Sequence, residues 1–350
     1  MKVEKKILAK LEKCYSLALL KYQGKEHLLA AAEKVERCLM FDMNGKLEDT
    51  IWREPGGAMG MLQVPGTDGQ FLAIHKFYSP NDSKDAKLVI VTPRERGDWE
   101  IRTLAELPHI HRFDILEREG VHYLIACTVK SGHAYKDDWS MPGKVYAAIL
   151  PDDISGFDEE HQLELEVIME GMTKNHGYYR IMDNNIQTAL ISAECGVFQL
   201  FPPERQKKKW EIKKMIGEPV SDAVLVDLDE DGEKELVAIS PFHGDEISIY
   251  KKDGCEMKKV YTYDGLARFS HAIFGGQMEK KPVIIIGHRR GERNLLLIKW
   301  NPAIKQYESR IIDCGCGSAN VLVCHYKGKE ILFSANREAN ELAMYTVEEI

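Results

Sequence analysis

The 350-residue sequence has no long apolar run, no basic excess and no dense cysteine framework. No stretch approaches the 18 apolar residues of a membrane helix, and residues 1–6 are too charged for a secretory signal, so we expect a cytoplasmic protein without a membrane partner. The eight cysteines are scattered, which argues against a small disulfide-stapled secreted domain. With 47 basic against 55 acidic residues, and one short basic run at 207–209, the chain is not expected to bind nucleic acid.

The sequence also has little helical periodicity; instead, a strand-forming pattern repeats along it. Seven times an apolar residue precedes Glu at the start of a short strand-like run, with intervals of 44 to 64 residues. The marks are Val3-Glu4, Leu47-Glu48, Trp99-Glu100, Leu163-Glu164, Trp210-Glu211, Cys255-Glu256 and Tyr307-Glu308. Each interval holds about four short apolar runs separated by turn residues, which is typical of a propeller blade. The sequence therefore predicts an all-β, seven-bladed β-propeller with four antiparallel strands per blade, as a single domain over residues 1–350.

The two ends of the chain are predicted to share one blade. The seventh repeat contains only three strand-like runs, at 321–324, 330–334 and 341–347, whereas residues 3–8 resemble an isolated fourth strand. Pairing them would remove the exposed edges of an open array. The alternative is an amphipathic helix over residues 3–14, where apolar residues also recur at helical spacing.

One turn in the fifth repeat has an unusual concentration of carboxylates. Asp227, Asp229, Asp231 and Glu235 surround Gly232, and such a loop can direct several hard oxygens toward a Ca²⁺ ion. The run resembles the calcium loops of FG-GAP and VCBS propeller repeats. The alternative is a solvated acidic turn that holds no ion. In either case the loop joins the first two strands of its blade and is expected on the face opposite the histidines described next.

Superposition of the repeats predicts a ring of side chains around the central axis. His111, His176 and His271 fall at one position in blades three, four and six. The equivalent positions in the other blades are Tyr15, Gly60, Ser221 or Asp222, and Ala319 or Asn320. Three imidazoles suit a divalent metal (Zn, Mn or Mg) with one coordination position open for substrate. The alternatives are metal-free histidine catalysis and hydrogen bonding between blades.

More polar residues are predicted on the same face. His109, His133, His243 and His288 lie in loops that reach it, and the long blade-three loop at 129–143 adds Lys136, Asp137, Asp138 and Trp139. An aromatic ring beside carboxylates can stack on a sugar and hydrogen-bond to it, and Arg289 and Arg337 could bind a carboxylate or stabilise an enolate. A solvated insertion and surface ion pairs are the simpler interpretations of these two features.

Several of these stretches together resemble one enzyme family. Residues 108–112 (Pro-His-Ile-His-Arg), 136–139 (Lys-Asp-Asp-Trp) and 142–144 (Pro-Gly-Lys), with the single calcium-type loop, resemble the propeller domain of fungal aldos-2-ulose dehydratase and its smaller bacterial relatives. The resemblance implies a lyase that eliminates water from a keto-sugar such as an anhydrofructose, a glucosone or a keto-glycoside. The chain has no room for the cupin domains of the fungal enzyme, so their isomerisation is not expected.

The roles follow from what such an elimination needs. A metal on His111, His176 and His271 would polarise the carbonyl, His109 or His133 would take the α-proton, and Tyr179, Arg289 or Lys136 would protonate the leaving hydroxyl or stabilise the enolate. Substrate contacts are expected from Asp137, Asp138, Trp139, His243, His288 and Arg337. The competing hypothesis is a non-catalytic scaffold that binds a protein or a sugar. The sequence does not indicate an oligomeric state.

Overall fold

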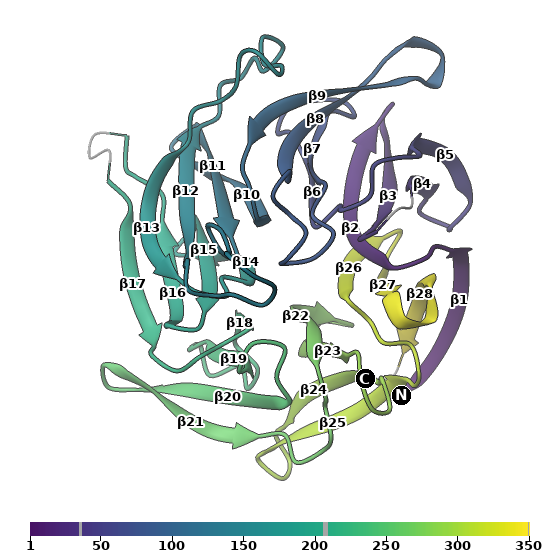
Figure 1. Cartoon of the computed structure of the whole chain (residues 1–350). Coiled ribbons are helices and arrows are strands. Elements are labelled where there is room, and N and C mark those ends of the chain that lie inside the picture. The colour runs from purple at the N-terminus through teal and green to yellow at the C-terminus, as the bar shows by residue number, and fades with distance from the viewer. Residues whose placement is uncertain (35–36, 206–208, 349) are drawn as a thin grey trace.

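The computed structural model describes residues 1–34, 37–205, 209–348 and 350 and forms a closed ring of seven four-stranded antiparallel sheets (Figure 1). The predicted seven-bladed β-propeller is therefore confirmed. Two of the three residues in the basic run at 207–209, Lys207 and Lys208, lie outside the described residues. Among the described residues, no helix has the length and the apolar composition to cross a bilayer.

The first four blades are consecutive in the chain and are numbered in chain order. Blade one is β2 (Cys14–Tyr22), β3 (Lys25–Ala32), β4 (Cys38–Asp42) and β5 (Leu47–Trp52). Blade two is β6 (Met61–Gln63), β7 (Phe71–His75), β8 (Lys87–Pro93) and β9 (Trp99–Glu106), with the 3-10 turn η1 (Glu95–Gly97). Blade three is β10 (Ile110–Arg118), β11 (Val121–Thr128), β12 (Gly143–Ile149) and β13 (Glu166–Met172). Blade four is β14 (Gly177–Asp183), β15 (Ile186–Ala193), β16 (Gly196–Phe201) and β17 (Glu211–Ile216).

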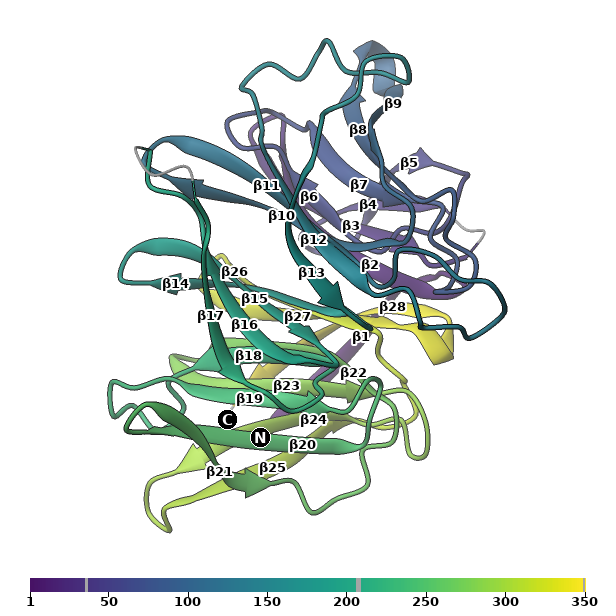
Figure 2. The same cartoon turned by 60° about the vertical axis from the view of Figure 1, so that its left-hand side comes forward.

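The remaining three blades complete the ring. Blade five is β18 (Asp222–Val226), β19 (Glu235–Ser240), β20 (Glu246–Asp253) and β21 (Glu256–Thr262). Blade six is β22 (Ser270–Met278), β23 (Lys281–His288), β24 (Leu295–Asn301) and β25 (Gln306–Asp313). Blade seven is β26 (Asn320–Tyr326), β27 (Lys329–Asn336), β28 (Glu341–Glu348) and β1 (Lys2–Lys10), with the 3-10 turn η2 (Arg337–Ala339). Figure 2 shows blades five and six with their strands side by side, from β18 and β22 to β21 and β25.

Closure of the ring depends on the first strand. β1 pairs with β28 in an antiparallel register that places Val3 opposite Val347, and the two termini lie side by side (Figure 1). Lys5 adds ion pairs to Asp313 at 2.8 Å and to Glu341 at 2.7 Å. The alternative of a helix over residues 3–14 is wrong, because the free edge of β28 offers this segment a full ladder of backbone hydrogen bonds.

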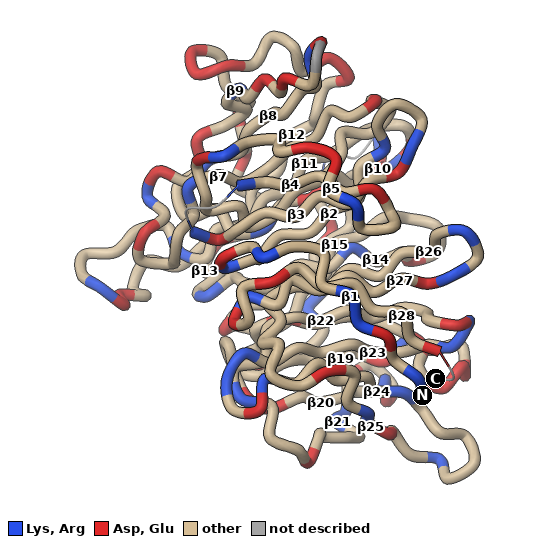
Figure 3. Tube along the Cα trace, turned by 90° about the vertical axis from the view of Figure 1, so that its right-hand side faces the viewer, with Lys and Arg blue, Asp and Glu red and all other residues tan. Residues whose placement is uncertain are grey.

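The core lies between adjacent blades. The second strand of most blades is almost wholly buried, as in β7, β19 and β23, and its side chains pack against those of the next blade; Leu39 of blade one and Phe333 of blade seven share one cluster. Outer strands are exposed and carry charge, which Figure 3 shows along β1. All eight cysteines lie in the described part of the chain and are free thiols. The inner ends of the blades are thus held rigidly from both sides.

Candidate functional site

Three β-bulges direct side chains toward the axis. The pairing of β2 with β3 skips Tyr15, that of β10 with β11 skips His111, and that of β22 with β23 skips His271. A residue without a partner in the ladder is free to turn its side chain away from the blade. All three side chains are buried, and the Tyr15 hydroxyl lies 3.4 Å from Nε2 of His111 and 3.3 Å from Nε2 of His271.

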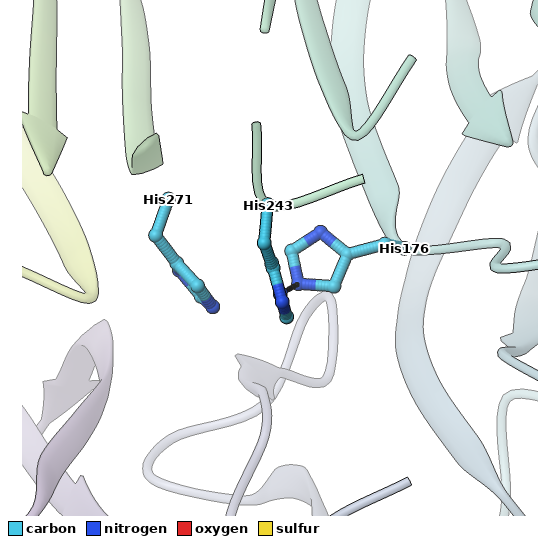
Figure 4. Close-up of side chains that lie close together, drawn as sticks. All are labelled: His176, His243 and His271. Carbon is cyan, nitrogen blue, oxygen red and sulfur yellow. Dashed lines mark hydrogen bonds between the residues drawn. The ribbon is translucent and has the colours of Figure 1, made fainter. Parts of the chain in front are cut away.

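Two further imidazoles reach the same point from loops. His176 directly precedes β14, and His243 follows β19 in a left-handed backbone conformation with φ of 50°. Figure 4 shows that the rings of His176, His243 and His271 approach one another, and one nitrogen of each lies within 4.8 Å of the others. Nε2 of His243 is 3.2 Å from Nε2 of His176. We call His111, His176, His243 and His271 the axial histidine cluster.

Hydrogen bonds to the far side of two rings fix their orientation. Nδ1 of His176 donates to Oδ2 of Asp222 at 2.6 Å, and Nδ1 of His271 donates to the carbonyl of Ala319 at 2.7 Å. With the proton on Nδ1, each Nε2 lone pair is left to face the centre of the cluster. A carboxylate or carbonyl behind an imidazole is the usual support of a metal ligand.

Three members of the cluster are held in their uncharged form. Burial lowers the pKa of His111, His243 and His271 well below the ordinary value, and neighbouring positive charges, including Arg112, lower it further. Neutral imidazole is the form that binds metal. Nδ1 of His111 is buried and has no hydrogen-bond partner among the described residues. These observations fit a divalent ion, and an all-imidazole donor set suits zinc better than magnesium, which prefers oxygen ligands.

The predicted ligand set is brought together, with one difference in grouping. His176 and His271 lie within the tight group, but the third member of that group is His243, which the sequence placed among the substrate contacts. His111 lies beside it, with its ring centroid 4.5 Å from that of His176. Superposition of repeats could not find His243, because it lies in a loop after a second strand rather than at the ring position.

The blade-three loop lies over the cluster through aromatic contacts. The Trp139 ring packs edge-on against Phe242 at 5.5 Å, and Phe242 stacks on His243 at 3.9 Å. Lys130, fully buried, lies 4.2 Å from the centre of the Trp139 ring and donates to the carbonyl of Asp138. The loop is therefore fixed against the site at Trp139, whereas Lys136 and Asp137 are exposed.

The carboxylates of this loop are engaged within the loop region. Asp138 accepts backbone hydrogen bonds from Ala134 and Ser140, which lower the pKa of its carboxyl to about 2. Asp137 accepts from the side chain of Asn81 at 2.8 Å. Asp138 thus shapes the loop, and Asp137 is the carboxylate of the pair that stays at the surface.

The two candidate bases form a pair of their own. The rings of His109 and His133 are 5.6 Å apart, and Nδ1 of His109 is 2.8 Å from the hydroxyl of Ser83. Burial, then the charges of His133 and Lys130, lowers the pKa of His109 to about 4. His109 is therefore neutral at pH 7, in the form that can accept a proton.

The other predicted residues are committed to protein contacts. The Tyr179 hydroxyl donates to the carbonyl of Gly275 at 2.7 Å, and both ring nitrogens of His288 bond within its own hairpin, to Arg290 O and Asn294 N. Arg289 binds Glu338 at 2.9 Å. Arg337 binds both Glu338 and Glu33. The structure does not bring Tyr179 or His288 into the axial histidine cluster.

The acidic loop of blade five is already paired with a lysine side chain. Oxygens of Asp227, Asp229 and Glu235 lie within 4.8 Å of one another. Asp227 and Asp229 each keep a buried oxygen without a hydrogen-bond partner in the described part of the chain, as a calcium site would require. Lys251, however, places its ammonium against Asp229, against Asp231 at 2.8 Å and against Glu235 at 3.3 Å. A calcium ion here would compete with Lys251.

The sequence did not single out four residues that shape the axial site. The repeat pattern gives Tyr15 and Asp222 only as equivalents of the histidines, and it gives no signal for Phe242 and Phe269. Phe269 stacks on His243 at 4.5 Å. The ring position itself was the signal for the first two, since a Tyr or Asp at a position that is His in three blades points to the same axis.

No family model matches the chain, and no curated protein matches it. Solved propellers do. A streptogramin B lyase structure aligns over 99% of this chain and 97% of its own length, with a TM-score of 0.58 and 11% identity. A candidate 6-phosphogluconolactonase from Bacteroides uniformis aligns over 97% of this chain and 93% of its own, with a TM-score of 0.55 and 13% identity. At such identity the likeness establishes the seven-bladed propeller fold alone.

Proposed function

We propose that the protein is a cytoplasmic, metal-assisted carbohydrate lyase that removes water from a keto-sugar by β-elimination. The observation that supports this most strongly is the convergence of buried imidazoles, two of them anchored through Nδ1, at one end of the propeller axis. His176, His243 and His271, with His111 beside them, would hold the ion. A divalent ion bound there would supply Lewis-acid polarisation of the ketone next to the C–H bond that breaks.

The chain's own residues would handle the protons. In the elimination, the α-C–H bond breaks, a C=C bond forms, and the β-C–O bond breaks as its oxygen takes a proton and leaves as water. His109 or His133 is proposed as the base, because His109 is neutral at pH 7. The Tyr15 hydroxyl lies against two axial imidazoles and is better placed than Tyr179 to hold or donate a proton there.

The decisive experiment measures metal content and elimination together. The purified protein should carry about one transition-metal ion per chain, and incubation with 1,5-anhydrofructose or a 3-keto-glucoside should give an ultraviolet-absorbing enone. His176→Ala, His243→Ala and His271→Ala should each lose the ion and the enone while keeping the circular dichroism of the parent. Turnover that survives in all three variants would overturn the assignment of the cluster.

A calcium ion in the blade-five loop belongs to the same proposal as a structural cofactor. Its support is the cluster of carboxylates from Asp227, Asp229 and Glu235, in which two buried oxygens have no hydrogen-bond partner among the residues that the structure describes. Bound calcium should stabilise the folded state, since the unfolded chain cannot assemble the loop. Identical melting curves with calcium and with a chelator would show that this loop binds no stabilising calcium ion.

A binding scaffold is the alternative, and one observation favours it. A groove of about 980 Å³ lies at the outer edge of blades three and four, lined by Tyr123, Ile149, Ile168 and Trp210 among others. Ile149 is 63% exposed, so the groove offers an apolar surface to a protein or sugar ligand. A metal-free protein that turns over no keto-sugar would favour this function.

A further inference from the structure

The surroundings of the axial histidine cluster are positively charged in a chain whose net charge is -8. Arg112 directly follows the bulged His111, and its guanidinium lies 5.9 Å from the centre of the Tyr15 ring. Its one hydrogen bond to a described residue runs from Nη1 to the carbonyl of Met59 at 3.0 Å. Within the described part of the chain, Arg112 has no carboxylate partner, so most of its donors remain available.

A second pair of guanidiniums lies beside His243. Arg289 and Arg290 stand 4.9 and 4.7 Å from the centre of the Phe269 ring, which stacks on His243. Arg289 shares Glu338 with Arg337, whereas Arg290 forms no ion pair with any described carboxylate. Positive charge therefore exceeds negative charge on this side of the cluster as well.

The carboxylates near the cluster are already paired with other groups, and Glu33 is bound to Arg337. Asp222 is buried and bound to Nδ1 of His176, on the far side of the imidazole from the cluster centre. A metal ion would add further positive charge. A neutral sugar would leave Arg112 and any bound ion uncompensated in a site shielded from water, whereas an anionic ligand would neutralise them.

We infer that the ligand of the axial site carries a carboxylate group, which Arg112 binds beside the axial histidine cluster. This rests on the proposed function and predicts that keto-sugars with a carboxylate bind more tightly than neutral ones such as 1,5-anhydrofructose. A planar guanidinium matches a carboxylate with two parallel hydrogen bonds, whereas phosphate is normally bound by several cations or backbone amides at once. Tyr15, between the Arg112 guanidinium and two imidazoles, provides a hydroxyl on the same side.

The test measures binding rather than turnover. Isothermal titration of the metal-loaded protein with D-glucuronate, D-glucose 6-phosphate and D-glucose at one ionic strength should give binding of glucuronate at least tenfold tighter than of the other two. Arg112→Gln should lose at least tenfold in affinity for glucuronate and change nothing for glucose, and Arg112→Lys should recover part of the loss. Arg310→Gln, an exposed arginine on outer strand β25, should bind like the parent.

Three results would overturn the inference. Equal affinity for glucuronate and glucose would remove the anion site, tighter binding of glucose 6-phosphate would assign it to phosphate, and unchanged glucuronate binding in Arg112→Gln would remove Arg112. If Arg112→Gln does not fold, the salt dependence of the parent decides: glucuronate binding must weaken between 50 and 300 mM NaCl while any glucose binding does not. Glucuronate binding without elimination of any keto-sugar would retain the anion site and reject the lyase.

Discussion

The axial histidine cluster and the acidic loop of blade five are two places where side chains converge as if on a cation, and they are built in opposite ways. At the axis the converging groups are imidazoles, three of which are held in the neutral form by burial, and Arg112 adds positive charge beside them. In blade five the converging groups are anionic, and Lys251 already supplies a positive charge among them. Neutral ligands can be buried together without a counter-charge, whereas clustered carboxylates repel one another and cannot. The comparison teaches that the axial imidazoles can stay in place without an ion, whereas the carboxylates of blade five need either an ion or Lys251.

The largest effect is expected from opening the ring of blades on which both sites depend. Deleting residues 1–9 takes away most of the fourth strand of blade seven, with seven of the eight paired residues of its ladder and the ion pairs of Lys5. At roughly 1 kcal/mol per backbone hydrogen bond, the free energy of unfolding should fall by several kcal/mol. Thermal denaturation of the truncated chain should show a much lower melting temperature; an unchanged value would contradict the closure argument.

The second prediction concerns the support of the axial site. Asp222→Asn keeps the shape of the side chain but removes the charge that holds Nδ1 of His176, so metal affinity should fall by about 10- to 100-fold. The measurement is competition for the ion with a chelator of known affinity. Asp253→Asn, an exposed aspartate at the end of β20, is the control and should not change the affinity.

The third prediction tests whether Lys251 and calcium occupy the same place. Lys251→Met leaves Asp229, Asp231 and Glu235 without their counter-charge, so the variant should melt several degrees below the parent in chelator. Calcium at about 100 times its dissociation constant should restore roughly 3 kcal/mol. Lys252→Met, whose side chain is largely exposed and pairs with Glu233, is the matched control. A calcium response no greater than that of the control would separate the lysine from the ion.

The smallest effect concerns an imidazole that belongs to neither site. His75 ends β7, and burial, followed by the charges of Lys87 and Lys76, lowers its pKa to about 3, while its ring packs 4.6 Å from that of Trp52. The unfolded chain takes up this proton near pH 6.5, so the contribution of His75 to stability is full above that pH and is lost as the pH falls toward 3. His75→Phe should flatten the decline in melting temperature between pH 6 and 4. A decline as steep as that of the parent, or an equal flattening in the exposed control His161→Phe, would contradict this.

The sequence predicted the fold well because the signal is repeated seven times. The strand expected at 330–334 lies within β27 (Lys329–Asn336), and that expected at 341–347 lies within β28 (Glu341–Glu348). Repetition averages out the ambiguity of any one short apolar run. Even the orphan segment at 3–8 could be assigned, since a ring with one strand missing leaves only one place for it.

The site was harder to predict, because its details depend on contacts between repeats rather than within one. The ring position found His111, His176 and His271, since the same count of residues leads to the axis in each blade, and it gave Tyr15 only as their equivalent in blade one. The count could not reveal that the loop after β19 folds His243 back onto His176. Nor could it show that Lys251 on β20 turns toward the acidic loop, or that Tyr179 bonds across to Gly275.

The bulges at Tyr15, His111 and His271 also separate the strand pairing of each blade from the side-chain chemistry at the axis. Because each of these residues lies outside the register of its ladder, its side chain contributes little to strand pairing, and its identity can change without disturbing the neighbouring hydrogen bonds. The bulged positions at the inner ends of the blades can therefore vary while the strands around them keep their pairing. A single substitution at such a position could change the functional group at the axis, as the tyrosine in blade one illustrates beside the histidines of blades three and six.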